Sequence, residues 1–300
     1  MKFTKMHGCG NDYIYVYTGT EHIADSDKPA LAVKLSDRHK GIGSDGLIFI
    51  NPTDKADFEM EMYNSDGSKG AMCGNGIRCV GKYVYDHGLT DKTTVDILTG
   101  AGVKQLKLRT EGGMAVEATV NMGAPILTPA KIPVVIKGYE DSEPIVAIPV
   151  EINSGKYNIT CVSMGNPHCV IFMDKDIKNL ELSDIGPLFE HGVIFPDRVN
   201  TEFINVHDRG HISMRVWERG SGETLACGTG ACASVVACVL NGYTERKVKV
   251  SLLGGDLDIY WNPKDDFVYM TGPAETVFDF LALPFLICWY IITPMAPIAI

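Results

Sequence analysis

Apolar and polar positions alternate along most of this chain, which predicts many strands and few helices. Alternating or short apolar stretches predict a strand before the HGCGND turn and further strands near 13–17, 47–50, 58–67, 93–98, 103–109, 114–121, 145–150, 157–163, 169–173, 198–206, 212–222, 246–252, 256–261 and 267–271. Helical apolar spacing is found near 28–37, near 183–190 and directly after Cys73 and Cys227. The pattern therefore predicts an α+β fold dominated by strands.

The strongest local signal is a frame that occurs twice, as MCGNGIRC at Met72–Cys79 and as ACGTGACA at Ala226–Ala233. In each copy a cysteine directly precedes Gly-x-Gly and the start of a predicted helix. The first N–H groups of a helix have no partner within it, and their positive potential favours a thiolate. We therefore expect a lowered pKa for both Cys73 and Cys227.

The surroundings of the two cysteines are duplicated at nearly one offset. Cys73 and Cys227 lie 154 residues apart, and Asn64 and Glu218 each precede their cysteine by nine residues. Near the N-terminus the turn GCGND, with Asn11, corresponds to MGNPH, with Asn166, at an offset of 155 residues. Three matches at almost the same spacing predict two halves of like topology.

This repeat predicts two lobes and leaves a C-terminal tail. We expect one lobe at 1–123, joined by a returning strand near 270–279, and a second at 124–269, with a proline-punctuated crossing at 124–134. Residues 280–300 carry no charge and are long enough to span a membrane, but three prolines would break a helix there. A membrane anchor, a segment packed on the body and a disordered or non-native extension all stay open.

Composition narrows the class of protein. A net charge of −10 without a polybasic run argues against nucleic acid as a partner. Nine cysteines, an odd number, and a start without an apolar signal segment favour free thiols in the cytoplasm. The chain has no C-x-x-C motif, and the cysteines of each frame are spaced so that they scatter around a helix, so we expect no metal site.

Two thiols at opposed helix N-termini suggest a specific chemistry. The helix ends form a seat for a carboxylate, and an α-amino acid held there would present one face of its Cα to each sulfur. A thiolate can remove the proton from one face while the opposite thiol delivers a proton to the other. The pattern predicts racemisation or epimerisation without a cofactor. Asparagines recur at equivalent loop tips and are expected to line the same cleft: Asn11, Asn64, Asn166 and Asn200.

Other functions explain less of the sequence. A cysteine hydrolase that uses His168 as its base would leave the second Cys-Gly frame unexplained. A thiol–disulfide oxidoreductase would be expected to carry C-x-x-C. A nucleotide-binding loop would need G-x-G-x-x-G after a strand. Cys161, Cys232 and Cys238 lie among Val and Ala and are interpreted as buried structural residues.

Five blocks of the chain resemble the diaminopimelate epimerase family in order and spacing: KMHGCGNDY, MYNSDGSKGAMCGNGIRC, VSMGNPHCV, RVNTEFINV and RVWERGSGETLACGTGACA. The resemblance extends over about residues 1–279. It implies two pseudo-symmetric lobes, each a mixed or antiparallel sheet wrapped around a central helix. It also implies interconversion of LL- and meso-2,6-diaminopimelate, for lysine and peptidoglycan synthesis, without a cofactor. We expect a homodimer, with membrane contact only if the tail is an anchor.

The resemblance assigns roles by position. Cys73 and Cys227 match the acid/base thiols, and His168 and Glu218 match residues that tune them. Matches to substrate contacts are Asn11, Gly74, Asn75, Gly228 and Thr229, with the glycine turns expected to cradle the reacting carboxylate. Matches to the polar set around the distal end are Asn64, Asn166, Asn200, Glu218 and Arg219. Cys9 and the tail depart from the family pattern. A related racemase of proline, hydroxyproline or histidine, and a non-catalytic binding protein for dicarboxylic amino acids, remain as alternatives.

Overall fold

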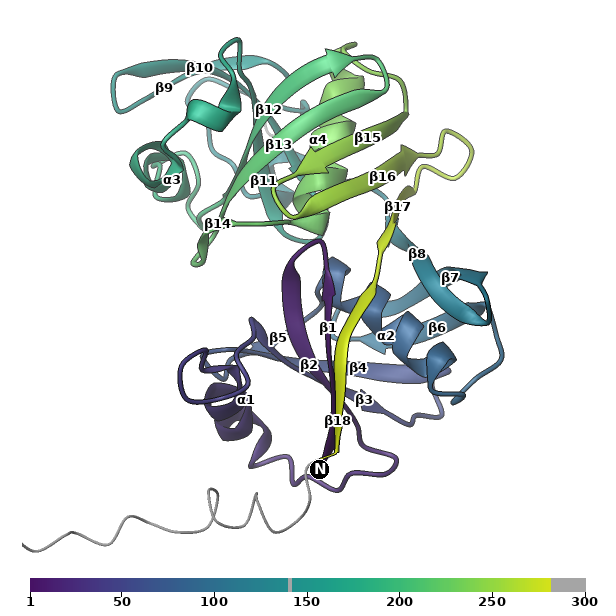
Figure 1. Cartoon of the computed structure of the whole chain (residues 1–300). Coiled ribbons are helices and arrows are strands. Elements are labelled where there is room, and N and C mark those ends of the chain that lie inside the picture. The colour runs from purple at the N-terminus through teal and green to yellow at the C-terminus, as the bar shows by residue number, and fades with distance from the viewer. Residues whose placement is uncertain (140–141, 282–300) are drawn as a thin grey trace, which may run out of the picture.

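A computed structural model of the chain describes residues 1–139 and 142–281 and has two lobes (Figure 1). The predicted α+β class is confirmed, because strands dominate and few helices accompany them. The α-helices of the described residues are α1 (Lys28–Ser36), α2 (Gly74–Asp86), α3 (Leu182–Glu190) and α4 (Gly228–Leu240). Helices α2 and α4 follow the two Cys-Gly frames, as their apolar spacing predicts.

The strands of the lower lobe in Figure 1 are β1 (Lys2–Gly8), β2 (Asn11–Tyr17), β3 (Gly46–Asn51), β4 (Phe58–Asn64), β5 (Lys69–Gly70), β6 (Thr94–Thr99), β7 (Gly102–Glu111) and β8 (Met114–Gly123). The upper lobe contains β9 (Ile148–Ile152), β10 (Gly155–Ser163), β11 (Pro167–Phe172), β12 (Asn200–Asp208), β13 (His211–Glu218), β14 (Gly222–Thr224), β15 (Lys247–Leu252) and β16 (Gly255–Trp261). Two further strands, β17 (Val268–Pro273) and β18 (Glu275–Leu281), lead back to the lower lobe.

Strand pairing repeats step by step between the lobes. The β1–β2 hairpin is followed by a parallel β2–β3 pair, an antiparallel β3–β4 pair and a parallel β4–β6 pair. In the second lobe the β10–β11 hairpin is followed by parallel β11–β12, antiparallel β12–β13 and parallel β13–β15. Because the same order of parallel and antiparallel steps recurs, the lobes are pseudo-symmetric, as the repeat predicts.

Two strand pairings tie the lobes together. Strands β8 and β17 pair antiparallel, with Val120 opposite Met270, and run between the lobes. Strand β18 then pairs with β1 in the lower lobe, with Thr4 opposite Asp279 (Figure 1). It includes Phe280 and Leu281, which the apolar pattern alone assigns to the tail. Residues 282–300, on which the question of an anchor depends, lie outside the described part of the chain.

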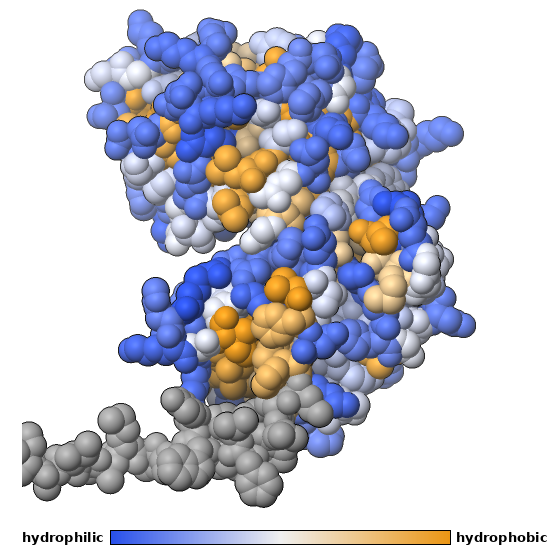
Figure 2. Space-filling model, in the orientation of Figure 1, coloured by the Kyte–Doolittle hydropathy of each residue, from blue (hydrophilic) through white to orange (hydrophobic). Residues whose placement is uncertain are grey.

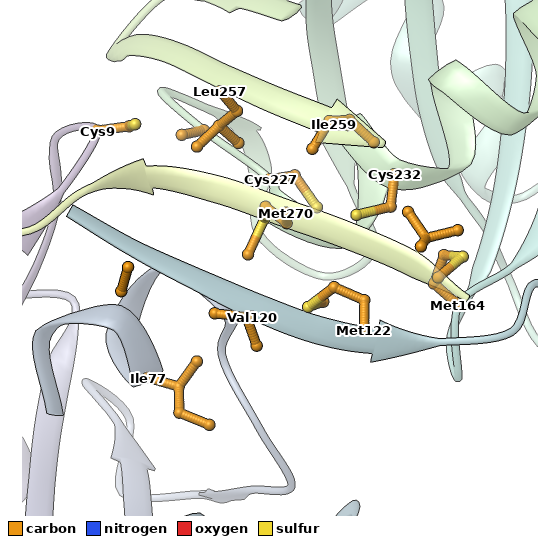
Figure 3. Packing of buried hydrophobic residues seen from close by; sticks show 14 of the residues in the cluster. Cys9, Ile77, Val120, Met122, Met164, Cys227, Cys232, Leu257, Ile259 and Met270 are labelled. Atoms are coloured by element: carbon orange, nitrogen blue, oxygen red, sulfur yellow. The ribbon is translucent and has the colours of Figure 1, made fainter. Parts of the chain in front are cut away.

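The central helices are buried at the core. Ile77, Val80 and Val84 of α2 are fully buried, as are Val235 and Val236 of α4. One apolar cluster contains both helices and continues between the lobes, where Met122 and Met270 lie between Ile77 and Cys227 (Figure 3). Each such side chain contributes about 1.5–3 kcal/mol by burial, so the cluster holds the two helix N-termini in a fixed relation.

Three predicted strands are wrong by about three or four residues at one end. The predicted strands 58–67 and 212–222 are too long, because β4 ends at Asn64 and β13 ends at Glu218. The apolar pattern predicts a strand at 145–150, but β9 begins at Ile148. Ala147 has a φ of 51°, a left-handed conformation that does not continue a strand. Among the described residues, no helix is both long enough and apolar enough to cross a bilayer.

Candidate active site

Both predicted thiols are N-cap residues. Cys73 caps α2 and Cys227 caps α4, each with an extended backbone. The sulfur of Cys73 accepts the N–H of Gly76 at 3.3 Å, and that of Cys227 accepts the N–H of Gly230 at 3.4 Å. Each thiol therefore satisfies one of the N–H groups that a helix leaves unpaired at its start.

The two capped ends converge. A Cβ placed on Gly74 would lie 3.8 Å from the Cα of Gly228, and one placed on Gly228 would lie 2.9 Å from the sulfur of Met270. Asn75 spans the gap by donating from Nδ2 to the carbonyl of Ala226 at 3.0 Å. Glycine allows this close approach, which places both thiol turns between the lobes (Figure 1). Figure 2 shows a notch between the lobes on the side of α1 and β14.

The neighbours of Cys73 come from the β1–β2 turn and the loop before β3. The thiol donates to Oδ1 of Asn11 at 3.2 Å, and Nδ2 of Asn11 donates to Asp45 at 2.7 Å. The buried hydroxyl of Tyr13 also lies against this sulfur and lowers the pKa of Cys73 in part. Asn11 therefore lies at the first thiol.

The neighbours of Cys227 form a longer polar chain. Its sulfur lies 3.4 Å from the hydroxyl of Thr229, which accepts a hydrogen bond from Nδ2 of Asn166 at 3.3 Å. Oδ1 of Asn166 lies 3.0 Å from Nε2 of His168, and Nδ1 of His168 lies 2.7 Å from the carboxylate of Glu202. His168 and Glu202 are completely buried, so the chain runs from the core to the thiol.

The expectation of lowered thiol pKa values is wrong. Burial raises the pKa of Cys73, and the N–H groups of Gly76 and Asn75 offset only part of that rise. Burial raises the pKa of Cys227 well above its usual value, and the nearby carboxylates of Glu218 and Glu202 raise it further. The helix-end argument omits desolvation, which disfavours the charged thiolate and here exceeds the helix term.

Glu218 lies within electrostatic reach of both thiols. Burial raises the pKa of Glu218, although hydrogen bonds with Thr224 and Cys227 partly counter the rise. Its negative charge in turn raises the pKa of Cys73 as well as that of Cys227. Glu218, which the nine-residue spacing singles out, therefore influences the pKa of both thiols.

The other predicted residues occupy the margins of this region. Asn64 ends β4, is half-buried and donates to the hydroxyl of Ser68 at 2.9 Å. Arg219 is exposed and donates to the backbone carbonyl of Asp197 at 2.9 Å. Asn200 is buried and bonds backbone at both ends of its amide, donating to Pro167 and accepting from the N–H of Arg219. In this geometry Asn200 positions Arg219.

The sequence reasoning missed several residues that contact or influence the thiols or their partners: Tyr13, Asp45, Glu202 and Thr224. All four lie in or beside segments singled out for other reasons. Tyr13 is two residues from Asn11, and Glu202 is two residues from Asn200 on the same strand, so both share a strand face with a predicted residue. This spacing could have found Tyr13 and Glu202, whereas no comparable spacing points to Asp45 or Thr224.

One hollow in the described part of the chain lies away from the thiols. A hollow of about 930 Å³ on the second lobe includes neither thiol. Its two histidines are already hydrogen-bonded, His207 to Ser213 and His211 to Ser251. In the described ranges, no group of three or more His, Cys, Asp or Glu side chains is arranged to hold a metal ion.

The fold and the thiol pair define the class first. The fold matches the crystal structure of a hydroxyproline epimerase from Agrobacterium vitis with bound trans-4-hydroxy-L-proline, with a TM-score of 0.64 over 93% of this chain and 90% of that one. The identity is 15%, so the likeness establishes the two-lobed architecture alone. This protein is therefore a two-lobed α+β protein of that architecture, with a cysteine at each central helix.

Closer relatives establish the family. The family model for diaminopimelate epimerase matches residues 3–128 and 160–277. The diaminopimelate epimerase of Agathobacter rectalis is 55% identical over 282 residues, which cover 93% of this chain and 98% of that protein. That of Acetivibrio thermocellus is 55% identical over 279 residues, which cover 93% and 97%. The chain belongs to the diaminopimelate epimerase family, and the resemblance in the five blocks is confirmed.

Proposed function

We propose that this protein is an isomerase that interconverts LL-2,6-diaminopimelate and meso-2,6-diaminopimelate in lysine and peptidoglycan precursor synthesis. Family membership supports this assignment, since relatives at 55% identity are diaminopimelate epimerases. The observation that carries the chemistry is the convergence of two N-terminal cysteine caps, Cys73 and Cys227, on one space between the lobes. Two acid/base groups facing one carbon are what inversion at Cα requires.

The reacting carboxylate would lie between the two helix ends. The turns at Gly74–Asn75 and Gly228–Thr229 begin α2 and α4, where backbone N–H groups and the helix dipoles favour an anion. These groups would also stabilise the charge that moves into the carboxylate when the Cα proton leaves. Because each of these turns adjoins a thiol, a carboxylate between them would leave Cα within reach of both sulfurs.

Proton transfer would then use the thiols in opposite states. One sulfur, as thiolate, takes the Cα proton, and the C–H electron pair moves toward the carboxylate. The opposite thiol gives its proton to the other face of Cα, so the pair exchanges roles in each turnover. The raised pKa values of Cys73 and Cys227 make either thiolate a stronger base, while lowering its population in the empty cleft. His168 and Glu218 would adjust this balance.

The rest of the substrate would extend toward the margins of the cleft. Arg219 can present two parallel N–H donors to the distal carboxylate, and Asn200 holds its backbone in place. Asn11, Asn64 and Asn166 would complete the polar lining. Proline, hydroxyproline and histidine each have only one amino acid end, so none of them would occupy the polar residues proposed for the distal end. This favours diaminopimelate as the substrate.

The direct test is an assay of the purified full-length chain with LL-diaminopimelate, without an added cofactor and with the stereoisomers resolved. We expect meso-diaminopimelate to accumulate until the two isomers reach equilibrium. Parallel incubations with L-proline, trans-4-hydroxy-L-proline and L-histidine should give no inversion. Inversion of one of these amino acids but not of diaminopimelate would replace the proposed substrate, and binding of diaminopimelate without inversion would leave a binding protein.

We also propose a cytoplasmic homodimer. β18 pairs only with β1 among the described strands and exposes Val277, Phe278 and Phe280, an apolar edge suited to a second copy. The eight cysteines of the described residues are free thiols, as is usual in a reducing compartment. Light scattering should give about twice the 32.7 kDa chain mass, and a monomer would reject the dimer.

A further inference from the structure

The two thiols have the same backbone setting, but the chains of side-chain hydrogen bonds that lead to them differ in whether their direction is fixed. At Cys73 the chain of hydrogen bonds ends on a carboxylate, Asp45, which can only accept. At Cys227 the corresponding chain also ends on a carboxylate, Glu202, but it passes through the imidazole of His168, whose Nε2 donates or accepts according to the tautomer. The first chain therefore has one possible direction, and the second can run either way.

The direction of the first chain follows from the atoms. Asp45 faces Nδ2 of Asn11, because an amide oxygen placed 2.7 Å from a carboxylate would be repelled. Oδ1 of Asn11 must then face the sulfur of Cys73 at 3.2 Å, where it can only accept. A protonated thiol satisfies this oxygen and a thiolate does not. An acceptor beside an acid favours its neutral form.

Asp45 is itself held in this position. Its Oδ2 accepts the backbone N–H of Asp12 at 3.1 Å, and its Oδ1 accepts from Arg38 at 2.9 Å. Arg38 also pairs with Asp12 at 2.7 Å, and Lys5 lies 3.0 Å from the same carboxylate. The carboxylate of Asp45 is therefore fixed by a backbone N–H of β2 and by Arg38 in the segment after α1, and Arg38 is itself held by Asp12.

We propose that Asp45 is a positioning residue that fixes the amide of Asn11 and so holds Cys73 as the protonated thiol in the empty cleft. The role of Cys73 as the proton donor of the first turnover rests on the proposed function. The protonated state of Cys73 in the empty cleft does not. At Cys227 the orientation of the Asn166 amide is not fixed by a carboxylate, because its Oδ1 faces a ring nitrogen of His168 that donates or accepts according to the tautomer.

Other groups that face Cys73 act alongside this lock. Tyr13 on β2 donates to the sulfur and opposes the lock, while Glu218 on β13 raises the thiol pKa. Tyr15 on β2 and Cys79 on α2 also lie within electrostatic range of the sulfur and are buried. Tyr13 also hydrogen-bonds the Asn11 side chain, but Asp45 is the carboxylate that accepts from its Nδ2, at 2.7 Å. Replacing Asp45 therefore isolates the effect of the amide.

The test follows the rate at which iodoacetamide alkylates each thiol between pH 6 and 10, without substrate, resolved by peptide mass spectrometry. Below a midpoint this rate rises about tenfold per pH unit, so a displaced line of rate against pH reports a shifted midpoint even for Cys227, whose pKa is raised well above its usual value. In Asp45→Asn the new amide can accept from or donate to Asn11, which is then able to turn its Nδ2 toward the sulfur. We expect the midpoint for Cys73 to fall by about one pH unit, which is about tenfold faster alkylation at pH 7. The Cys227 midpoint, read from the same samples, should stay in place.

Controls separate the positioning role of Asp45 from a general loss of structure. Asp57→Asn removes a carboxylate with the same kinds of partner, the backbone N–H of Asp96 and the amine of Lys92, and should leave both midpoints unchanged. If Asp45→Asn does not fold, Asn11→Ala removes the acceptor directly and should lower the Cys73 midpoint in the same way. An unchanged Cys73 midpoint, or equal shifts at Cys73 and Cys227, would overturn the proposal.

The same variant has an expected catalytic signature. The alkaline limb of the pH profile for kcat/KM should move about one pH unit lower in Asp45→Asn, since Cys73 loses its proton earlier. A shifted Cys73 titration in a protein that does not invert diaminopimelate would reject the proposed function and keep the role of Asp45. An active enzyme with an unshifted titration would do the reverse.

Discussion

Cys73 and Cys227 share a backbone setting but not a chemical one. Each caps a helix and accepts one N–H, yet Cys73 is half-buried beside an amide oxygen, and Cys227 is buried beside a hydroxyl and two carboxylates. The pKa of Cys227 is raised further than that of Cys73 for this reason. The repeated fold fixes where the sulfurs lie, and the neighbouring side chains decide how readily each gives up a proton.

This difference matters because inversion needs two unlike partners at any moment. Two thiols with identical surroundings would have equal populations of the two useful forms, thiolate on one side and thiol on the other. Unequal surroundings bias the empty enzyme toward one form, while a bound substrate can shift the balance. The duplicated backbone supplies the symmetry that reversible inversion requires, and the diverged polar residues supply the bias.

The largest expected effect comes from removing either sulfur. Cys73→Ala and Cys227→Ala should each lower kcat by about 10²- to 10⁴-fold, since general acid–base transfer is lost on one face. Diaminopimelate binding, measured by calorimetry, should change little, because the proposed contacts are amide, guanidinium and backbone groups. The comparison between the lobes predicts equal severity for the two variants despite the different surroundings.

A matched control lies one turn further along α4. Cys232 is fully buried and is not part of the thiol site, so Cys232→Ala should retain wild-type kcat. If Cys227→Ala remained active, or if only one of the two end thiols proved necessary, the two-thiol mechanism would be wrong and a single-base mechanism would replace it.

Much of this arrangement could be predicted from the sequence. Alternation located most strands, and the repeated frame placed Cys73 and Cys227 at helix starts. The sign of the thiol pKa shift could not be predicted, because burial is a property of the whole fold and no local motif encodes it. The link from Asp45 to Asn11 was hidden for a similar reason, as it joins residues 34 apart across a parallel strand pair.

A second pair of equivalent positions shows the same divergence in charge. On β4 and β5, Glu61 pairs with Lys69 at 2.7 Å, and 154 residues later on β13 and β14, Arg215 pairs with Glu223 at 2.7 Å. The bridge between the two strands is thus kept with its signs reversed. Glu61 is nearly buried, whereas Glu223 is partly exposed. Glu61 also accepts from Lys28 at 2.6 Å.

This contrast predicts a stability difference between the lobes. Burial alone would raise the pKa of Glu61, but hydrogen bonds from Lys28 and Lys69 outweigh it and lower the pKa to about 2. A depressed pKa stabilises the fold above the unfolded-state value near 4.5, and this stability is lost as the pH falls toward 2. Glu61→Gln should therefore lower the free energy of unfolding at pH 7 by about 3 kcal/mol.

Urea unfolding at several pH values checks this prediction. The deficit of Glu61→Gln relative to wild type should shrink between pH 4.5 and pH 2, as Glu61 of the wild type becomes protonated. Glu223→Gln, the sign-reversed counterpart with a side chain 29% exposed, should cost less than about 1 kcal/mol. Equal costs for the two variants would mean that burial does not distinguish the bridges.

The smallest expected effect tests how closely the two thiol turns approach. A Cβ on Gly228 would lie 2.9 Å from the sulfur of Met270, and one on Gly74 would lie 3.0 Å from its terminal methyl. Alanine at a helix start gains up to about 1 kcal/mol by restricting the unfolded chain, whereas overpacking costs about 1–3 kcal/mol. Because a methionine side chain can move aside, we expect the overpacking cost to exceed the gain by only about 1 kcal/mol in Gly228→Ala.

Activity should respond more than stability in this variant, since a shifted helix end misplaces a thiol relative to Cα. We expect kcat to fall about tenfold in Gly228→Ala and Gly74→Ala alike, with recovery when Met270→Ala is added to make room. Gly210→Ala is the matched control, because its Cβ would meet only Asp208 at an ordinary 3.5 Å. If Met270→Ala restored neither variant, Met270 would not be the contact that both helix ends share. The convergence of the lobes on one substrate carbon would then lose its structural support.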